Sequence, residues 1–341
     1  MPVKLLDKIA RVIRAGPGSR NHLFIMALAS LWLLTGSLAL AADKPVVRVG
    51  ALKSGTLSWE LEVIVRHHLD QTNGIQISEI DTQRAEATET DLREGRVDVI
   101  LSNWFWVSQQ RAAGADWTFV PFSTAVGVLV TPPGTTIRSL PDLKGRRLGV
   151  VGTSHDENWL ILRLAAQQRY GFDLSEGSTA SFGPPAAITE RLKAGEIDAA
   201  LTLWQIAARL EGDGMRRALS VNDVVHELGV SSDVPLLGYV FSEKWARANP
   251  SRLEGFLHAA KDANAILATS DTEWDRIAPL IGMHSPAELA SVRDAFRAGI
   301  PRHWGPAGRA DAERLYALLG KSGAEPGTRL APGTFFDVAP Y

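Results

Sequence analysis

The feature that most constrains the fold is an internal repeat at an offset of 100 residues. Leu92–Trp104 aligns with Leu192–Trp204, and leucine, glycine, aspartate, leucine and tryptophan recur at matched places in the two segments. Upstream, Val49–Trp59 aligns with Gly149–Trp159, and each is a short apolar run that ends in small polar residues and then tryptophan. A solenoid needs at least three copies of its repeat. A single duplication therefore predicts two similar α/β units that face one another.

The amino terminus has the order of a secretory signal, namely a basic segment, an apolar segment and a small-residue cleavage site. Basic residues precede the apolar stretch Leu23–Leu34, and the stretch leads to Ala39-Leu40-Ala41. We expect residues 1–41 to be a signal peptide that is cleaved after Ala41. An uncleaved membrane anchor is the alternative, because Leu23–Ala42 is nearly long enough to span a bilayer.

Charge and cysteine content narrow the class of partner. The whole chain has a formal net charge of -2, and cleavage would remove five basic residues but a single acidic one, Asp7. An acidic mature chain argues against nucleic acid or an anionic membrane as the main partner. The chain has no cysteine, so it has no site for lipid attachment next to the signal. We therefore expect a monomer that is free in the periplasm.

Strands and helices alternate along both halves of the repeat. Apolar spacing predicts strands at Val46–Leu52 and Val97–Leu101, with a helix at Trp59–Leu69 between them. Such alternation is typical of a mainly parallel sheet flanked by helices, in which ligands bind beyond the carboxyl ends of the strands. The predicted fold class is α/β, with two lobes and two hinge crossings. Lobe 1 comprises residues 45–130 and 237–341 with the carboxy-terminal helices, and lobe 2 comprises residues 131–236.

Candidate ligand-binding residues lie near the predicted strand ends of both lobes. Tryptophan rings there can stack on a planar ligand or attract a quaternary ammonium, although each ring can equally pack against its own sheet. Hydroxyls and backbone amides at a helix start can accept an anionic group, or the hydroxyls can simply cap the helix. The predicted site comprises Ser54, Gly55, Thr56, Trp59, Asn103, Trp104, Thr153, Ser154, Trp159 and Trp204.

Three segments resemble the solute-binding proteins of ABC importers, in the branch that contains the aliphatic sulfonate, taurine, nitrate and thiamine-precursor binding proteins. These are the opening strand and polar turn Arg48–Trp59, the Leu92–Leu101 segment and the Ser139–Val150 segment, and the resemblance covers Val46–Ala268. It implies a type II periplasmic-binding-protein fold that closes on a small-molecule ligand and docks on an ABC permease in the cytoplasmic membrane. The ligand it favours is an organic anion, such as a sulfonate or a related nitrogen or sulfur compound. The turn Gly152–Asn158 departs from the pattern, because it is more acidic than a pure anion binder would need.

Motifs that are typical of catalysis or metal binding are missing from the sequence. There is no Gly-x-Ser-x-Gly elbow, no phosphate-binding loop and no His-Glu-x-x-His pair. His155 stands beside two acidic residues but lacks a second histidine at ligand spacing. We therefore expect no catalytic residue, no metal and no cofactor. Two alternatives remain: an enzyme on the same scaffold, similar to pyrimidine-forming relatives of this branch, and a ligandless sensor or partner protein whose cleft is filled by its own side chains.

Overall fold

The computed structural model describes residues 44–53, 55–82, 85–322 and 327–338. Pro45–Tyr341 forms one unit, and Met1–Lys44 forms another, of which only Lys44 is described. The predicted signal peptide, residues 1–41, therefore lies outside the described residues. All that follows concerns the unit that begins at Pro45.

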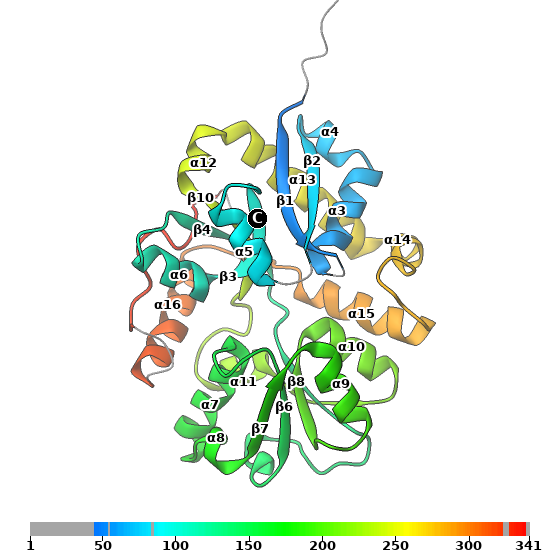
Figure 1. Ribbon diagram of the computed structural model, residues 1–341, viewed down its shortest axis with the longest axis vertical. Coiled ribbons are helices and arrows are strands. Elements are labelled where there is room, and N and C mark those ends of the chain that lie inside the picture. The colour runs from blue at the N-terminus through cyan, green and yellow to red at the C-terminus, as the bar shows by residue number, and fades with distance from the viewer. Residues whose placement is uncertain (1–43, 54, 83–84, 323–326, 339–341) are drawn as a thin grey trace, which may run out of the picture. The chain divides into compact units, whose positions relative to one another are not determined.

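This unit contains two five-stranded sheets built to one plan, as Figure 1 shows. The strands are β1 (Val46–Leu52), β2 (Gln76–Thr82), β3 (Val99–Asn103), β4 (Trp117–Ser123), β5 (Val128–Thr131), β6 (Arg147–Val151), β7 (Thr179–Gly183), β8 (Ala199–Thr202), β9 (Arg216–Ser220) and β10 (Leu237–Ser242). The first sheet has the order β2-β1-β3-β10-β4, and the second has the order β7-β6-β8-β5-β9. In each sheet the first three strands run parallel, and the inserted strand, β10 or β5, runs antiparallel to both neighbours.

Helices cover the faces of both sheets. They are α3 (Thr56–Arg66), α4 (Leu69–Thr72), α5 (Ala85–Arg93), α6 (Trp104–Ala112), η1 (Leu140–Leu143), α7 (Glu157–Tyr170), α8 (Leu174–Gly177), α9 (Pro185–Lys193), α10 (Trp204–Gly212), α11 (Val221–Glu227), α12 (Glu243–Ala248), α13 (Pro250–Thr269), α14 (Asp271–Ile277), α15 (Pro286–Gly299) and α16 (Pro306–Lys321). The alternation predicted from periodicity is confirmed for both repeats, with boundaries displaced by a few residues.

The chain passes between the sheets at two places. Residues 124–127 lead from β4 to β5, and residues 228–236 lead from α11 to β10. Two crossings were predicted. The first comes earlier than the predicted lobe boundary at residue 130, because Val128–Thr131 already pairs with β8 and β9 of the second sheet.

An arginine–aspartate pair stabilises the same turn in each sheet. Asp98 accepts hydrogen bonds from the backbone N of Arg48 at 2.8 Å and from its guanidinium Nη2 at 2.6 Å. Asp198 accepts the equivalent bonds from Arg147 at 2.8 and 2.7 Å. The recurring aspartate of the repeat therefore ties the end of a helix–strand turn to the neighbouring strand, which is a structural role.

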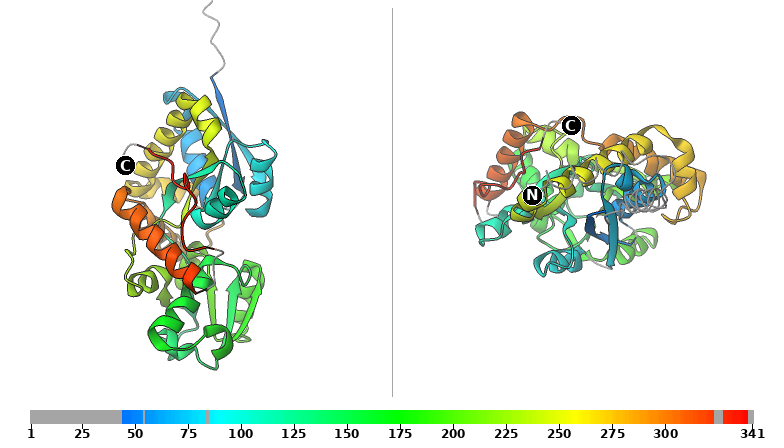
Figure 2. Two further views of the ribbon diagram at one scale, coloured as in Figure 1. Left: turned by 90° about the vertical axis from the view of Figure 1, so that its left-hand side faces the viewer. Right: turned by 90° about the horizontal axis from the view of Figure 1, so that it is seen from above.

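The carboxy-terminal helices pack on elements of both sheets. Helix α13 packs on α3 beside the first sheet, whereas α15 packs on α10 and α16 packs on α7 beside the second sheet. Beyond α16, Phe119 of β4 donates its backbone N–H to Thr334 O at 2.9 Å and accepts one from Phe336 N at 3.0 Å. This last segment, dark red in Figure 2, therefore covers the edge of the first sheet.

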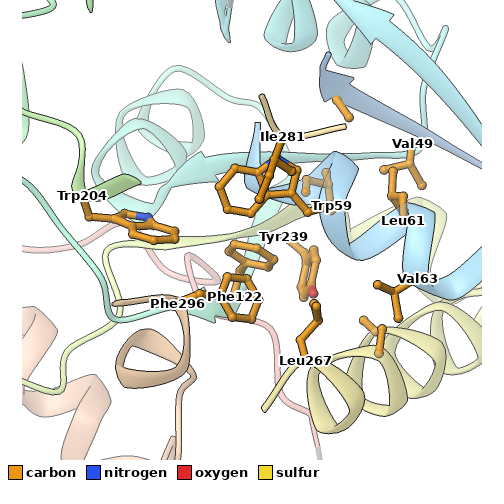
Figure 3. Close-up of a cluster of buried hydrophobic side chains, with 14 of the residues drawn as sticks. Val49, Trp59, Leu61, Val63, Phe122, Trp204, Tyr239, Leu267, Ile281 and Phe296 are labelled. Atoms are coloured by element: carbon orange, nitrogen blue, oxygen red, sulfur yellow. The ribbon is translucent and has the colours of Figure 1, made fainter. Parts of the chain in front are cut away.

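One buried aromatic cluster joins the two halves of the unit (Figure 3). Trp59 of α3 lies edge-on to Trp204 of α10, with ring centroids 6.1 Å apart, and edge-on to Trp274 of α14 at 6.3 Å. Phe296 of α15 contacts both Trp204 and Trp274. Residues from both repeats and from the carboxy-terminal helices thus share one core, which fixes the ring of Trp204 next to the space between the sheets.

Candidate functional site

A cavity of about 410 Å³ lies where the strand ends of the two sheets face one another. Its volume is within the range of small-molecule sites. The first repeat contributes the end of β1, the start of α3, part of α5 and the end of β3. The second repeat contributes the turns before and at the starts of α7 and α10, and the two crossing segments complete the wall. The lining residues are Gly50, Ala51, Leu52, Gly55, Thr56, Leu57, Thr88, Glu89, Leu101, Ser102, Asn103, Ala125, Val126, Gly127, Gly152, Thr153, His155, Asp156, Glu157, Asn158, Leu203, Trp204, Gln205, Leu236 and Leu237.

The structure brings half of the sequence-predicted site residues to this cavity. The predicted residues that line it are Gly55, Thr56, Asn103, Thr153 and Trp204. Those that do not line it are Trp59, Trp104, Ser154 and Trp159. Ser54 lies outside the described residues. The binding role of every one of them stays a prediction.

Three of the four repeat-related tryptophans are buried in the core and do not line the cavity. Trp104 is fully buried, and its indole Nε1 donates a hydrogen bond to Pro235 O at 2.8 Å while its ring stacks on Phe105. Trp159 is buried edge-on to Phe182. Both rings therefore pack in the core, which was the alternative to stacking on a ligand.

Trp59 also lies in the core, and α3 begins earlier than predicted. The predicted helix began at residue 59, but α3 begins at Thr56, so Trp59 is its fourth residue. Its ring lies edge-on to Trp204 and Trp274. Its indole Nε1 has no hydrogen-bond partner among the residues that the structure describes.

Trp204 differs because it is the first residue of α10 and also lines the cavity. Its side chain is held edge-on to Trp59 and inclined to Phe296. Only 6 % of the residue is exposed. A ligand would therefore meet a small, fixed part of this ring, which a rotamer change cannot easily withdraw.

Four helix starts border the cavity, and side chains cap two of them. Asn103 Oδ1 accepts from Trp106 N at 2.8 Å at the start of α6. Asp156 Oδ1 accepts from Asn158 N at 3.0 Å and from Trp159 N at 3.2 Å at the start of α7. The backbone amides at the start of α7, which we predicted could bind an anion, thus already donate hydrogen bonds to the Asp156 carboxylate. Among the residues that the structure describes, no side chain caps α3 or α10.

Two hydrogen bonds join the halves of the unit across this region. Asn103 Nδ2 donates to Glu157 Oε2 at 3.4 Å, and Gly127 N donates to the buried Asn158 Oδ1 at 2.8 Å. A Cβ atom at Gly127 would lie 2.7 Å from Asn158 Cγ. The first crossing can therefore approach the start of α7 this closely only because residue 127 is a glycine.

Sequence reasoning found only part of the acidic charge of the lining. Glu89, Asp156 and Glu157 line the cavity together with His155, and no lysine or arginine is among the described lining residues. Burial raises the pKa of Asp156, an effect that its hydrogen bonds from Trp159 and Asn158 oppose. The acidic turn Gly152–Asn158 was visible in the sequence, but Glu89 on α5 had no distinguishing pattern. Gln205 also lines the cavity and was not among the predicted site residues.

Within the described ranges, no group of three or more His, Cys, Asp or Glu residues could hold a metal ion. His155 has a contact of 3.4 Å between its Nδ1 and Ser154 Oγ, and Ser154 does not line the cavity. In the part of the chain that the structure describes, no helix has both the length and the apolar character needed to cross a membrane.

Comparison with solved structures identifies the fold. The alkanesulfonate-binding protein SsuA from Xanthomonas axonopodis pv. citri, bound to MOPS, matches with a TM-score of 0.68 at 18% identity, over 87% of this chain and 100% of that one. The periplasmic aliphatic sulphonate binding protein SsuA from Escherichia coli matches with a TM-score of 0.68 at 17% identity, over 85% and 97%. The periplasmic nitrate-binding protein NrtA from Synechocystis PCC 6803 matches with a TM-score of 0.59 at 9% identity, over 84% and 83%. The predicted two-lobed periplasmic-binding-protein fold is confirmed.

No curated protein sequence matches this chain. The family model for the periplasmic substrate-binding protein of the phosphonate ABC transporter matches residues 64–280, which is more than half of the chain. The chain therefore belongs to this family of periplasmic ABC-transporter substrate-binding proteins.

Proposed function

We propose that this chain binds one small polar organic solute in the cavity between its two sheets and delivers it to an ABC permease in the cytoplasmic membrane. The observation that carries the proposal is the cavity itself, because matched turns of both repeats form its walls. A ligand that contacts both walls stabilises the closed arrangement, in which the two sheets approach about the crossings. We further propose that the protein is a monomer in the periplasm after cleavage at Ala41.

The open cavity disfavours a ligandless partner protein. That alternative would need the cleft to be filled by the side chains of the chain, whereas about 410 Å³ remains between the described residues. The lining is mostly aliphatic and polar, with Trp204 and four titratable side chains at its acidic edge. Such a surface can hold a solute of modest size by burial and a few polar contacts.

An enzyme on this scaffold would place a general base with an orienting partner inside the cavity. The nearest approach to that arrangement is His155, whose ring contacts Ser154 outside the lining. A receptor requires no such pair. We therefore favour binding without turnover.

The sequence favoured an organic anion such as a sulfonate, held by amides at helix starts. No described side chain caps the starts of α3 and α10, which could make such a contact, whereas the start of α7 is already occupied by Asp156. The sulfonate and nitrate ligands named for the structural neighbours support an anion as one candidate.

Native mass spectrometry of the protein purified gently from its own periplasm tests the proposal. We expect a bound small organic compound whose mass is unchanged after prolonged incubation with the protein. Occupancy should fall in Gln205→Ala, which truncates a lining residue, and should persist in Gln167→Ala, whose side chain is exposed on α7 away from the cavity. Equal occupancy in both variants would place the compound elsewhere, and conversion of the compound would favour the enzyme.

A further inference from the structure

The two crossings between the sheets are each fixed to a helix by a side-chain hydrogen bond. In the first crossing, Gly127 N donates to Asn158 Oδ1 of α7 at 2.8 Å. In the second crossing, Pro235 O accepts from Trp104 Nε1 of α6 at 2.8 Å. The first crossing is thus tied to a helix of the second repeat and the second crossing to a helix of the first repeat. Neither of these two bonds joins the crossings to each other.

The side chain of Asn222 does join them. Asn222 is the second residue of α11, and its Nδ2 donates to Thr124 O of the first crossing at 2.9 Å. The same nitrogen donates to Ser232 O of the second crossing at 2.7 Å. A primary amide carries two N–H groups, so one side chain can hold both carbonyl oxygens at the same time. The two crossings are therefore linked through a single amide group.

The amide of Asn222 is held in place by the start of α11. Ser220, the residue that caps this helix, accepts a hydrogen bond from Asn222 N at 3.2 Å, and its hydroxyl donates to Asn222 Oδ1 at 3.4 Å. The neighbouring Val221 N donates to Gly127 O of the first crossing at 3.0 Å. Adjacent residues of α11 thus contact the first crossing through both backbone and side chain.

The crossings form part of the cavity wall, whereas Asn222 does not line the cavity. Val126 and Gly127 of the first crossing and Leu236 of the second crossing are lining residues. Crossings that moved independently would let the two sheets twist as well as close, so fewer closed molecules would present both walls to a solute in register. The apparent affinity falls in proportion to the fraction of molecules that are competent to bind.

We propose that Asn222 is a positioning residue for solute binding, which couples the two crossings so that the sheets close about one axis. It acts through the crossings and makes no contact with the solute. The inference rests on the proposed function, because a coupled hinge serves closure around a solute in the cavity.

The distribution of distances between the two halves of the unit tests this coupling. The chain has no cysteine, so Ser251→Cys on α13 and Ala186→Cys on α9, both at exposed positions, place one nitroxide label in each half. Pulsed electron–electron double resonance would be measured on the protein purified with its solute from its own periplasm. We expect a narrow distribution, which becomes about twofold broader when Asn222→Ala is added.

Asn222→Asp separates the clamp from the stability of α11. Aspartate keeps the size of the side chain and an oxygen that can accept from Ser220, and an acidic residue is favourable in the first turn of a helix. It replaces the donor by an oxygen that repels the carbonyl oxygens of Thr124 and Ser232. The distance distribution should broaden at least as much as in Asn222→Ala.

Asn73→Ala is the matched control. Asn73 Nδ2 also donates two hydrogen bonds, to Leu69 O at 2.9 Å and to Asp262 Oδ2 at 3.2 Å, away from both crossings. The control should lose a similar amount of thermal stability and keep the narrow distribution. Native mass spectrometry after gel filtration should show about tenfold less retained solute in both Asn222 variants than in Asn73→Ala.

Outcomes for the inference and for the proposed function differ. An unchanged distribution in both Asn222 variants, or equal broadening in Asn73→Ala, would overturn the clamp and leave a solute receptor intact. Broadening without loss of solute, or loss of solute without broadening, would contradict a role that acts through the crossings. The proposed function would fail only if the protein with asparagine at position 222 carried no solute from its own periplasm.

Discussion

Trp104 and Trp204 occupy the same place in the two repeats but have different surroundings. Each follows the last of the three parallel strands of its sheet, β3 or β8, and is the first residue of the next helix, α6 or α10. Trp104 is covered by the second crossing, where Pro235 O accepts its indole N–H. Trp204 packs instead on Trp59 and on Phe296 of a carboxy-terminal helix, and it lines the cavity. The duplication thus determines where the residue lies in the fold, whereas segments outside the duplication determine which residues its side chain contacts.

The largest expected effect comes from truncating the two rings. Trp104→Ala should lower the free energy of unfolding by about 3–5 kcal/mol, because it empties a fully enclosed site and leaves Pro235 O without its donor. Trp204→Ala should cost less stability, because the space it leaves opens into the cavity, where water can enter. Urea unfolding measures both losses, and the account fails for this pair if Trp204→Ala is the more destabilised variant.

The arginine–aspartate pairs give the next largest difference. The side chain of Asp98 is 5% exposed, whereas that of Asp198 is 28% exposed. Asp98→Ala should therefore cost about 2–3 kcal/mol and Asp198→Ala about 1 kcal/mol, since water screens and replaces the exposed pair more easily. Chemical denaturation of the two variants measures both losses of stability. Equal losses would show that the difference in burial does not change what the two pairs contribute to stability.

A buried carboxyl of the first repeat has an apolar counterpart in the second. Glu60 of α3 accepts hydrogen bonds from Tyr239 Oη at 2.7 Å and from Asn264 Nδ2 at 2.8 Å, whereas the equivalent residue of α7 is the buried Leu160. Burial raises the pKa of Glu60 to about 8, against its hydrogen bonds to Tyr239 and Asn264. The folded protein thus holds a proton there that the unfolded chain releases at lower pH.

Stability should accordingly fall as pH rises from the ordinary glutamate range through the folded pKa, with a loss of about 2 kcal/mol between pH 6 and pH 8. Glu60→Gln carries no ionisable group, so it should remove that loss while it retains polar contacts to Tyr239 and Asn264. Thermal unfolding across this pH window provides the measurement. If wild type and Glu60→Gln show the same pH dependence, Glu60 is ionised in the folded protein.

The smallest expected effect concerns the single hydrogen bond that distinguishes the two tryptophans. Trp104→Phe removes the donor to Pro235 O and should cost about 1 kcal/mol beyond the volume change. Trp204→Phe removes an indole that has ring contacts with Trp59 and Phe296. The quantity to measure is the difference between the two variants in lost free energy of unfolding. If the two losses are equal, the hydrogen bond to Pro235 makes no net contribution to stability.

Much of the fold could be predicted because it depends on local pattern. Strand and helix periodicity, the recurring Gly-x-x-Asp turn and the order of segments behind the signal were sufficient for two α/β lobes with two crossings. The site was less predictable. Thr153 and Ser154 are adjacent in one polar turn, yet only Thr153 lines the cavity. Trp59 packs on Trp204 and Trp274, and Glu89 and Gln205 reach the cavity through pairings between distant segments that no local pattern encodes.

Hydrogen–deuterium exchange tests the central claim most directly, that one cavity formed by matched turns of both repeats binds the solute. The protein carrying its native solute would be compared with the same protein after the solute has been stripped by partial unfolding and refolding. We predict slower exchange at residues 55–57 and 101–103 of the first repeat together with residues 152–158 and 203–205 of the second. Protection confined to one repeat, or to the separate hollow between α13 and residues 336–338, would contradict the account.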